Sequence, residues 1–215
     1  MPKPASMPSM PSMGEQRPYA AVVLAGGAGR RLGGVAKPVL PVAGQPMLHR
    51  VLAAVAGADP RVVVGPDQLP VPPDVAHTQE QPPGGGPVPA IAAGLALVPD
   101  GVPDLAVLAA DLPLLTGAAI RRLLDAAAGP GRDGAVFVDS AGRPQWLCGV
   151  WRTGPLRARL AALGPELAGL SMRRLLGDGD LSVARLTDPG PGPPPWWDCD
   201  TDADLQRAAA ELTGG

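Results

Sequence analysis

A short apolar run that ends abruptly in glycines constrains the fold of this chain more than any other stretch. Residues 20–25 read Ala-Ala-Val-Val-Leu-Ala, which is typical of a buried strand. The glycines and basic residues that follow are Gly26, Gly27, Gly29, Arg30, Arg31 and Lys37. Because glycines let a ligand approach the backbone amides closely, and the amides and basic groups favour anions, the segment predicts a phosphate-binding loop. A glycine-rich linker is the alternative, since the chain has 29 glycines.

The loop does not have the glycine spacing of either widespread phosphate-binding motif. It lacks the G-x-G-x-x-G pattern of dinucleotide-binding folds, and no Gly-Lys-Ser/Thr follows it as in a P-loop. The prediction of a phosphate site therefore rests on local chemistry.

Apolar runs and helix-like segments alternate along the chain five or six times. The expected strands are 20–25, 61–65, 75–78, 105–110, 135–138, 146–151 and 181–186, and the expected helices are 46–56, 88–98, 116–128, 155–163, 171–176 and 202–212. This alternation favours an α/β fold, a Rossmann-like three-layer sandwich with a mostly parallel mixed sheet. Residues 1–18, rich in Met, Pro and Ser, predict a disordered extension, and residues 19–213 a single domain.

Two further loops carry candidate ligand groups. Asp111 directly follows the apolar run 105–110, and open α/β sheets bind ligands at the carboxyl ends of their strands. Asp111 is therefore a candidate metal ligand, with capping of the turn at Pro113 as the alternative. Residues 79–87 end in Gly-Gly-Gly-Pro before a helix, which predicts free amides at a positive dipole end, or else a flexible surface loop.

Composition excludes several classes of protein. The net charge of −2 argues against a general nucleic-acid-binding protein, and two distant cysteines indicate neither a disulfide scaffold nor a zinc site. No apolar run approaches the ~20 residues that a membrane span needs, and the N-terminus has no apolar signal core. We expect a cytoplasmic protein with neither a nucleic-acid nor a membrane partner.

The glycine-rich segment also resembles a known family. Leu24-Ala25-Gly26-Gly27, Arg31, Gly33-Gly34 and Lys37 are similar to the signature loop of nucleotidyltransferases that use nucleoside triphosphates. The form of the loop most resembles the molybdenum cofactor guanylyltransferases. This resemblance implies transfer of GMP from GTP to molybdopterin, with release of pyrophosphate and formation of a guanine dinucleotide cofactor. It also implies Mg²⁺ as cofactor, and transient contact with molybdoenzymes or other proteins of cofactor synthesis.

The resemblance assigns roles to individual residues. Arg31 would neutralise the leaving pyrophosphate, Lys37 would lie between the attacking phosphate and the α-phosphate, and Asp111 would hold Mg²⁺. The implied nucleotide-binding residues are Leu24, Ala25, Gly26, Gly27, Gly29, Arg31, Lys37, Gly65, Glu80, Gly86 and Pro87. Among these, Glu80 would accept hydrogen bonds from guanine. Ala90 and Gly94 fall in the stretch that lines the nucleotide pocket of the family.

Two later segments also resemble the family. Residues 145–149 match its acceptor-binding half, and the nearby arginines Arg152, Arg173 and Arg174 are candidates for acceptor phosphates or else solvated surface charges. Residues 198–205 resemble the family's segment that leads into the last helix, with Asp198 and Asp200 where the family has asparagines. Here Asp200 is a candidate second metal ligand facing Asp111, and helix capping is the alternative.

Two departures from the family pattern bear on the acceptor. Ala36 replaces an aspartate before Lys37, and Pro38 follows that lysine as in sugar-phosphate relatives. The alternatives are a nucleotidyltransferase that uses CTP or another phosphorylated acceptor, such as a sugar phosphate or phospho-acid, and a non-catalytic nucleotide-binding subunit.

Overall fold

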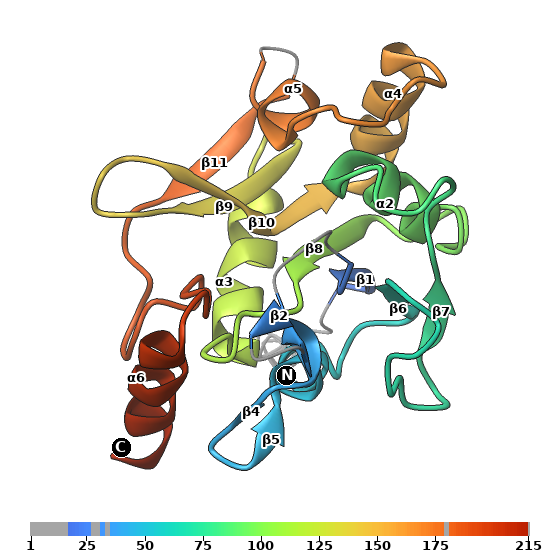
Figure 1. Cartoon of the computed structure of the whole chain (residues 1–215). Coiled ribbons are helices and arrows are strands. Elements are labelled where there is room, and N and C mark those ends of the chain that lie inside the picture. Colours follow the sequence, from blue (N-terminus) through green and yellow to red (C-terminus); the bar gives the residue numbers. More distant parts are fainter. Residues whose placement is uncertain (1–16, 27–30, 33–34, 179–180, 215) are drawn as a thin grey trace, which may run out of the picture.

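The structure is a computed structural model that describes residues 17–26, 31–32, 35–178 and 181–214 (Figure 1). The predicted extension at residues 1–18 lies outside the described residues except for its last two. Gly27 and Gly29 of the predicted phosphate loop also lie outside them. The division into an extension and one domain therefore stays a prediction.

A seven-stranded sheet forms the centre of the molecule. Its strands are β1 (Tyr19–Leu24), β6 (Arg61–Val64), β7 (Ala76–Thr78), β8 (Asp104–Ala109), β9 (Gly134–Val138), β10 (Pro144–Arg152) and β11 (Val183–Leu186), in the order β11-β9-β10-β8-β1-β6-β7. Every neighbouring pair is parallel except the two pairs that β10 makes with β8 and β9. The predicted mostly parallel mixed sheet is confirmed.

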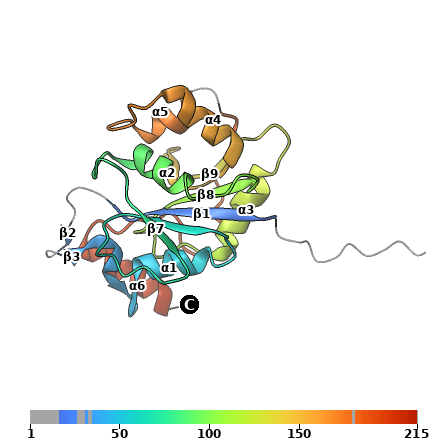
Figure 2. The ribbon, with the colours of Figure 1, turned by 90° about the vertical axis from the view of Figure 1, so that its right-hand side faces the viewer.

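Helices cover both faces of this sheet, as Figure 2 shows. Helices α1 (Met47–Ala54) and α3 (Gly117–Ala127) pack on one face, and α2 (Pro87–Leu95), α4 (Thr153–Leu163) and α5 (Met172–Leu176) pack on the other. Helix α6 (Asp202–Thr213) lies on the α1 side (Figure 2). The predicted three-layer sandwich is confirmed, and among the described residues no helix is long and apolar enough to cross a membrane.

Short elements between β1 and α1 were not predicted from the sequence. They are the hairpins β2 (Arg31–Leu32) with β3 (Val35–Ala36) and β4 (Pro41–Val42) with β5 (Gln45–Pro46), and the 3₁₀ helix η1 (Lys37–Val39). Strands of two residues carry no periodic pattern, so only their partners reveal them. Together they carry the chain from the glycine-rich loop to Lys37 and on to α1.

The strands beside β1 end level with it, which aligns the loops that follow. Leu24 lies opposite Ala109 on one side and opposite Val64 on the other. Backbone hydrogen bonds continue the ladder beyond the strands: Ala25 N donates to Val64 O (2.8 Å), and Ala110 N donates to Leu24 O (3.0 Å). The glycine-rich loop and the loops after β6 and β8 therefore start side by side at one edge of the sheet.

Helix α2 lies unusually close to the sheet because Gly94 has no side chain. A Cβ atom at this position would lie 2.6 Å from Val22 Cγ1 and 2.9 Å from Val64 Cγ2. The resemblance places Gly94 in the stretch that lines the nucleotide pocket of the family. In the structure, Gly94 lies on the side of α2 that packs against strands β1 and β6.

Gly94→Ala should lower the free energy of unfolding by about 1–3 kcal/mol, because the added methyl overpacks a closed interface of branched side chains. Urea unfolding followed by circular dichroism measures this. Gly154→Ala in α4 is the matched control, since a Cβ there has nothing within 4 Å, and it should be neutral or slightly stabilising. Equal unfolding midpoints for the two variants would contradict the packing argument.

Strand β10 lies in the middle of the sheet, between β8 and β9. It is antiparallel to β8, with Cys148 opposite Leu108 and Arg152 opposite Asp104. Its first residues therefore reach the edge where β8 ends, and its last residues reach the opposite edge.

Candidate active site

Three charged side chains from distant parts of the sequence meet at the edge where the parallel strands end. The ammonium Nζ of Lys37 lies 2.8 Å from Asp111 Oδ2 and 2.7 Å from Asp200 Oδ1. Lys37 begins η1, Asp111 follows β8, and Asp200 stands two residues before α6. The structure thus brings together three of the four residues for which the resemblance implies catalytic or metal-binding roles.

The cluster is partly sheltered from solvent. The side chain of Lys37 is 11 % exposed, that of Asp111 24 % and that of Asp200 41 %. Burial by itself would lower the pKa of Lys37, but the hydrogen bonds and negative charges of Asp111 and Asp200 outweigh burial and raise it. Lys37 is therefore protonated at neutral pH and holds the two carboxylates together.

The segment before α6 is held in place by a buried cysteine between two aspartates. Cys199 is fully buried in a small cluster that it forms with Val42, Met47, Leu114 and Ala208. Its backbone N–H donates to the carbonyl of Asp111 (3.3 Å). Because alternate residues of an extended segment face opposite sides, Asp198 and Asp200 both point away from this cluster.

The charge environment extends to Asp198. Burial raises the pKa of its carboxyl, and the negative charges of Asp200 and Asp111 raise that pKa further. Three carboxyl groups therefore influence one another around a single lysine. Of the two aspartates before α6, Asp200 is the one that shares Lys37 with Asp111.

Thr201, rather than Asp200, caps the last helix. The Thr201 hydroxyl accepts a hydrogen bond from Asp204 N (3.2 Å), and the Asp204 carboxylate accepts one from Thr201 N (2.9 Å), so the two form a capping box. The carboxylate of Asp200 lies against Lys37 instead. The capping alternative for Asp200 is thus wrong, and its role as a metal ligand stays a prediction.

Thr201→Ala should lower the free energy of unfolding by about 1 kcal/mol, because it removes the side-chain acceptor at the N-terminus of α6. Thermal unfolding of the purified variant measures the change. Thr213→Ala, at the other end of the same helix, is the matched control and should change stability less, because its hydroxyl bonds only to carbonyls of the last turn. An equal effect of both substitutions would argue against the capping box.

The donor set suits a small hard cation. Asp111 and Asp200 direct one carboxylate oxygen each toward a common point, and carboxylate oxygens are preferred by Mg²⁺. Among the described residues, no group of three or more His, Cys, Asp or Glu side chains could hold a metal ion. Mg²⁺ commonly takes one or two protein carboxylates and completes its coordination with water and substrate phosphates, so a two-carboxylate site fits this ion.

Gly65, assigned to the nucleotide site, is required by packing. It directly follows β6, and its N–H donates to Thr78 O (2.9 Å). A Cβ at this position would lie 2.8 Å from Leu69 Cδ1 and 3.0 Å from the carbonyl carbon of Ala25. Glycine thus lets the loop after β6 approach the start of the glycine-rich loop, where Ala25 and Gly26 lie.

Glu80 organises the loop that precedes α2. Its side chain is 5 % exposed, and its Oε1 accepts a hydrogen bond from Gly84 N (2.9 Å). The same loop is tied to residues 164–170, because Gly85 O accepts a hydrogen bond from Gly169 N (2.8 Å). The loop at 79–87 therefore has one internal hydrogen bond and one tie to residues 164–170, and contact between Glu80 and a guanine base stays a prediction.

The start of α2 offers fewer free amides than expected. Gly86 is the N-cap residue with φ of +100°, a conformation that favours glycine, and Pro87 occupies the first helical position. However, Pro87 and Pro89 lack N–H groups, so two of the first helical donors are absent. The start of α2 therefore contributes few backbone donors, and phosphate binding by the loop at 79–87 stays a prediction.

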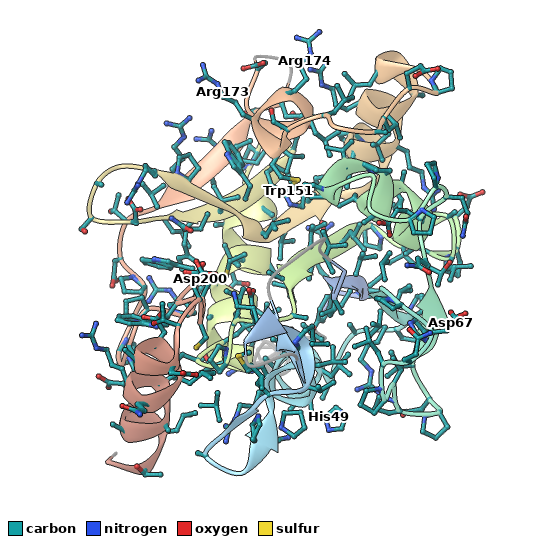
Figure 3. The ribbon with its side chains drawn as sticks, in the orientation of Figure 1. His49, Asp67, Trp151, Arg173, Arg174 and Asp200 are labelled. Carbon is teal, nitrogen blue, oxygen red and sulfur yellow. The ribbon has the colours of Figure 1, made fainter. Side chains whose placement is uncertain are left out.

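The arginines expected near acceptor phosphates lie elsewhere. Arg152 Nη1 pairs with Asp104 Oδ1 (3.0 Å) at the start of β8, and Asp104 is 1 % exposed. This is the sheet edge opposite Lys37, because β10 runs antiparallel to β8. Arg173 and Arg174 project from α5 at the periphery, far from Asp200 (Figure 3). None of the three lies beside the Lys37 cluster. For Arg31 only the main chain, in β2, is described, so its role stays a prediction.

The two thiols do not provide a nucleophile. Burial raises the pKa of Cys148 to about 12, and burial together with nearby carboxylates raises the pKa of Cys199 to about 12. Both groups are protonated at neutral pH, when a thiol is a poor nucleophile. The chemistry of the site therefore rests on charged oxygen and nitrogen groups.

The chain belongs to the family described as the MobA-like NTP transferase domain, whose model matches residues 21–183. It is therefore a nucleotidyltransferase, as the glycine-rich segment had indicated. Its similarity to an individual protein of assigned function covers less of the chain than the family match does. It is 38 % identical over 136 residues to the bifunctional protein GlmU of Rhizorhabdus wittichii, a match that spans 60 % of this chain and 30 % of that protein's length.

Solved structures show the same fold at low sequence identity. Molybdopterin-guanine dinucleotide biosynthesis protein A of Archaeoglobus fulgidus superposes with a TM-score of 0.69 at 19 % identity, covering 91 % of this chain and 100 % of that one. The 2-C-methyl-D-erythritol 4-phosphate cytidylyltransferase of Thermus thermophilus superposes with a TM-score of 0.66 at 19 % identity, covering 90 % and 98 %. At these identities the likeness establishes the fold and leaves the substrate open.

Proposed function

We propose that the protein transfers GMP from GTP to molybdopterin, with or without bound molybdenum, and releases pyrophosphate to form the guanine dinucleotide cofactor. The observation that carries the proposal is the Lys37 ammonium between Asp111 and Asp200, at the edge where β1, β6 and β8 end. In an open α/β sheet this edge is where ligands bind. A reaction between anionic phosphates needs positive charge. The Lys37 ammonium supplies one such charge, and the two carboxylates are suited to hold a metal ion that supplies more.

In the proposed reaction, an oxygen of the acceptor phosphate attacks the α-phosphorus of GTP. The bond from that phosphorus to the bridging oxygen breaks, and the oxygen leaves with its electron pair as part of pyrophosphate. A phosphate nucleophile is already ionised, so no general base is needed. Catalysis then consists of positioning and of neutralising charge on oxygen atoms.

The residues of the site have distinct proposed tasks in this reaction. Lys37 lies between the attacking phosphate and the α-phosphate and reduces their repulsion. Arg31 and the amides of the glycine-rich loop neutralise the leaving pyrophosphate. Asp111 and Asp200 hold Mg²⁺, which when bound supplies further positive charge to the phosphates.

Support for guanine and for the pterin acceptor comes from two sources. The family is MobA-like, and a protein of the same fold along its whole length is named for molybdopterin-guanine dinucleotide biosynthesis. Glu80 adds a carboxylate to the loop at 79–87, and a carboxylate can accept hydrogen bonds from the N1–H and N2–H₂ donors of guanine.

A different nucleotide or acceptor is the second candidate, and specific residues favour it. Ala36 and Pro38 flank Lys37 in the manner of sugar-phosphate relatives. One matched relative is a GlmU protein, and one structural neighbour is a cytidylyltransferase named for a phosphorylated erythritol. Under this alternative the three charged groups keep their tasks, and only the pockets for base and acceptor differ.

Pyrophosphate release tests the proposal directly. The purified protein is incubated with Mg²⁺, with GTP or CTP, and with molybdopterin or glucose 1-phosphate, in all four combinations. Release with GTP and molybdopterin alone is the expected result. Release with another pair would replace the substrates and keep the transferase assignment, whereas tight nucleotide binding without release from any pair would favour a regulatory subunit.

A further inference from the structure

The basic residue at position 37 is a lysine, a residue type that is rare in this chain. The sequence has 18 basic residues, and only Lys3 and Lys37 among them are lysines. Arginine has a broad planar group suited to forked hydrogen bonds, whereas lysine presents a compact, strongly hydrated point charge on a flexible stem. A compact ammonium fits between two converging carboxylates, and a flexible stem lets it move from one set of anions to another.

The ammonium group of Lys37 lies between the two carboxylates to which the proposed function assigns the metal ion. Its nitrogen lies 2.8 Å from Asp111 Oδ2 and 2.7 Å from Asp200 Oδ1, so it makes close contact with the two oxygens that the proposed function assigns to Mg²⁺. The Lys37 side chain is only 11 % exposed. The ammonium and a divalent cation would therefore compete for the same negative charge.

We propose that Lys37 is an internal counter-ion that opposes divalent-cation binding to Asp111 and Asp200 until a nucleoside triphosphate is present. This inference rests on the proposed nucleotidyl transfer. In the nucleotide-free protein, Lys37 neutralises the two carboxylates. When the triphosphate binds, its phosphates offer the ammonium a second set of anions and leave the carboxylates to the metal ion.

The balance of charge explains why the exchange needs both ligands. A divalent cation alone would have to displace the Lys37 ammonium from two carboxylates without offering it another anion. A triphosphate alone would bring negative charge toward Asp111, Asp198 and Asp200. The two ligands together supply a partner for every charge, so each should strengthen the binding of the other by the same factor.

Mn²⁺ binding to the nucleotide-free protein tests the first half of the proposal. Electron paramagnetic resonance measures free Mn²⁺ in the presence of the wild-type protein, Lys37→Met and Lys37→Gln. Both variants should bind Mn²⁺ at least about tenfold more tightly than wild type, because they remove a unit charge at contact distance from both carboxylates. Lys3→Met makes the same change at the only other lysine and should bind as wild type does.

The second half is tested on the wild-type protein, so it does not depend on a variant folding. With ¹³C,¹⁵N-lysine labelling, the side-chain NMR signals come from two residues, and Lys37→Gln identifies which signal belongs to Lys37. Mg²⁺ alone, at a concentration that saturates turnover, should leave the Lys37 signal in place. Mg²⁺ together with a non-hydrolysable GTP analogue should shift it, while the Lys3 signal stays unchanged.

Two results would overturn the proposal. Equal Mn²⁺ affinity of wild type and both Lys37 variants would show that the lysine does not compete with the metal, and a full shift of the Lys37 signal with Mg²⁺ alone would show that no nucleotide is needed. Pyrophosphate release by the wild-type protein is measured separately. Release without the Mn²⁺ effect would refute the counter-ion role alone, whereas absence of release would refute the proposed function.

Discussion

Lys37→Ala should lower kcat for nucleotidyl transfer by about 100- to 1,000-fold, which is the cost of removing one preorganised charged donor from a transition state. The lysine holds Asp111 and Asp200 at 2.8 and 2.7 Å before the reaction, and in the proposed mechanism it offsets repulsion between two phosphates during the reaction. Steady-state pyrophosphate release with saturating substrates measures the loss.

The control for this substitution is Lys3→Ala, which removes the same charge and stem from the chain's other lysine and should retain full activity. The fold should survive in Lys37→Ala, because the contacts of Lys37 are to two partly exposed carboxylates rather than to the apolar core. Wild-type turnover in a variant with an unchanged circular dichroism spectrum would refute the role of Lys37.

Asp111→Asn should abolish Mg²⁺-dependent turnover, with a loss of at least about 1,000-fold, because an uncharged amide is a weak ligand for a hard cation and a metal ion supplies several kcal/mol of charge stabilisation. The substitution keeps the size of the side chain. It also keeps the main-chain carbonyl that accepts the hydrogen bond from Cys199 N, so the segment before α6 should stay in place. Turnover is measured across a range of Mg²⁺ concentrations.

Asp125→Asn, on the exposed side of α3, is the matched control and should show the Mg²⁺ dependence of wild type. A loss in Asp111→Asn that rising Mg²⁺ concentration restores in full would still place Asp111 at the metal. Unchanged turnover at every concentration would remove it from the site.

The strand and the glycine-rich loop at the start of the site could be predicted from sequence because the patterns that indicate them are local. A run of β-branched and apolar residues followed by glycines and basic residues predicts a strand and a loop without knowledge of their neighbours. The same holds for Asp111, which directly follows the buried run of β8. Sheet order is not local, and nothing in residues 146–151 indicates that β10 inserts antiparallel between β8 and β9. That insertion is why Arg152 lies at the edge opposite the cluster.

The outcome for Asp200 agrees with patterns in the sequence around it. Capping and metal binding were equal alternatives because an acidic residue near a helix start serves either purpose. The order Asp198-Cys199-Asp200 places one apolar residue between two acidic ones, which is the period-two pattern of an extended segment with one buried face. Thr201 with Asp204 three residues later is in turn a capping-box pattern. Together these patterns favour Thr201, rather than Asp200, as the cap of α6.

Asp200 lies outside the part of the chain that matches the family model. That match ends at residue 183, and Asp200 contributes one carboxylate of the cluster from beyond it. Buried Cys199 and Ala208, the main-chain hydrogen bond from Cys199 to Asp111 and the ion pair between Asp200 and Lys37 attach this tail to the rest of the domain. Replacing this tail with that of a relative would therefore exchange one carboxylate of the cluster and leave the loops after β1, β6 and β8 unchanged.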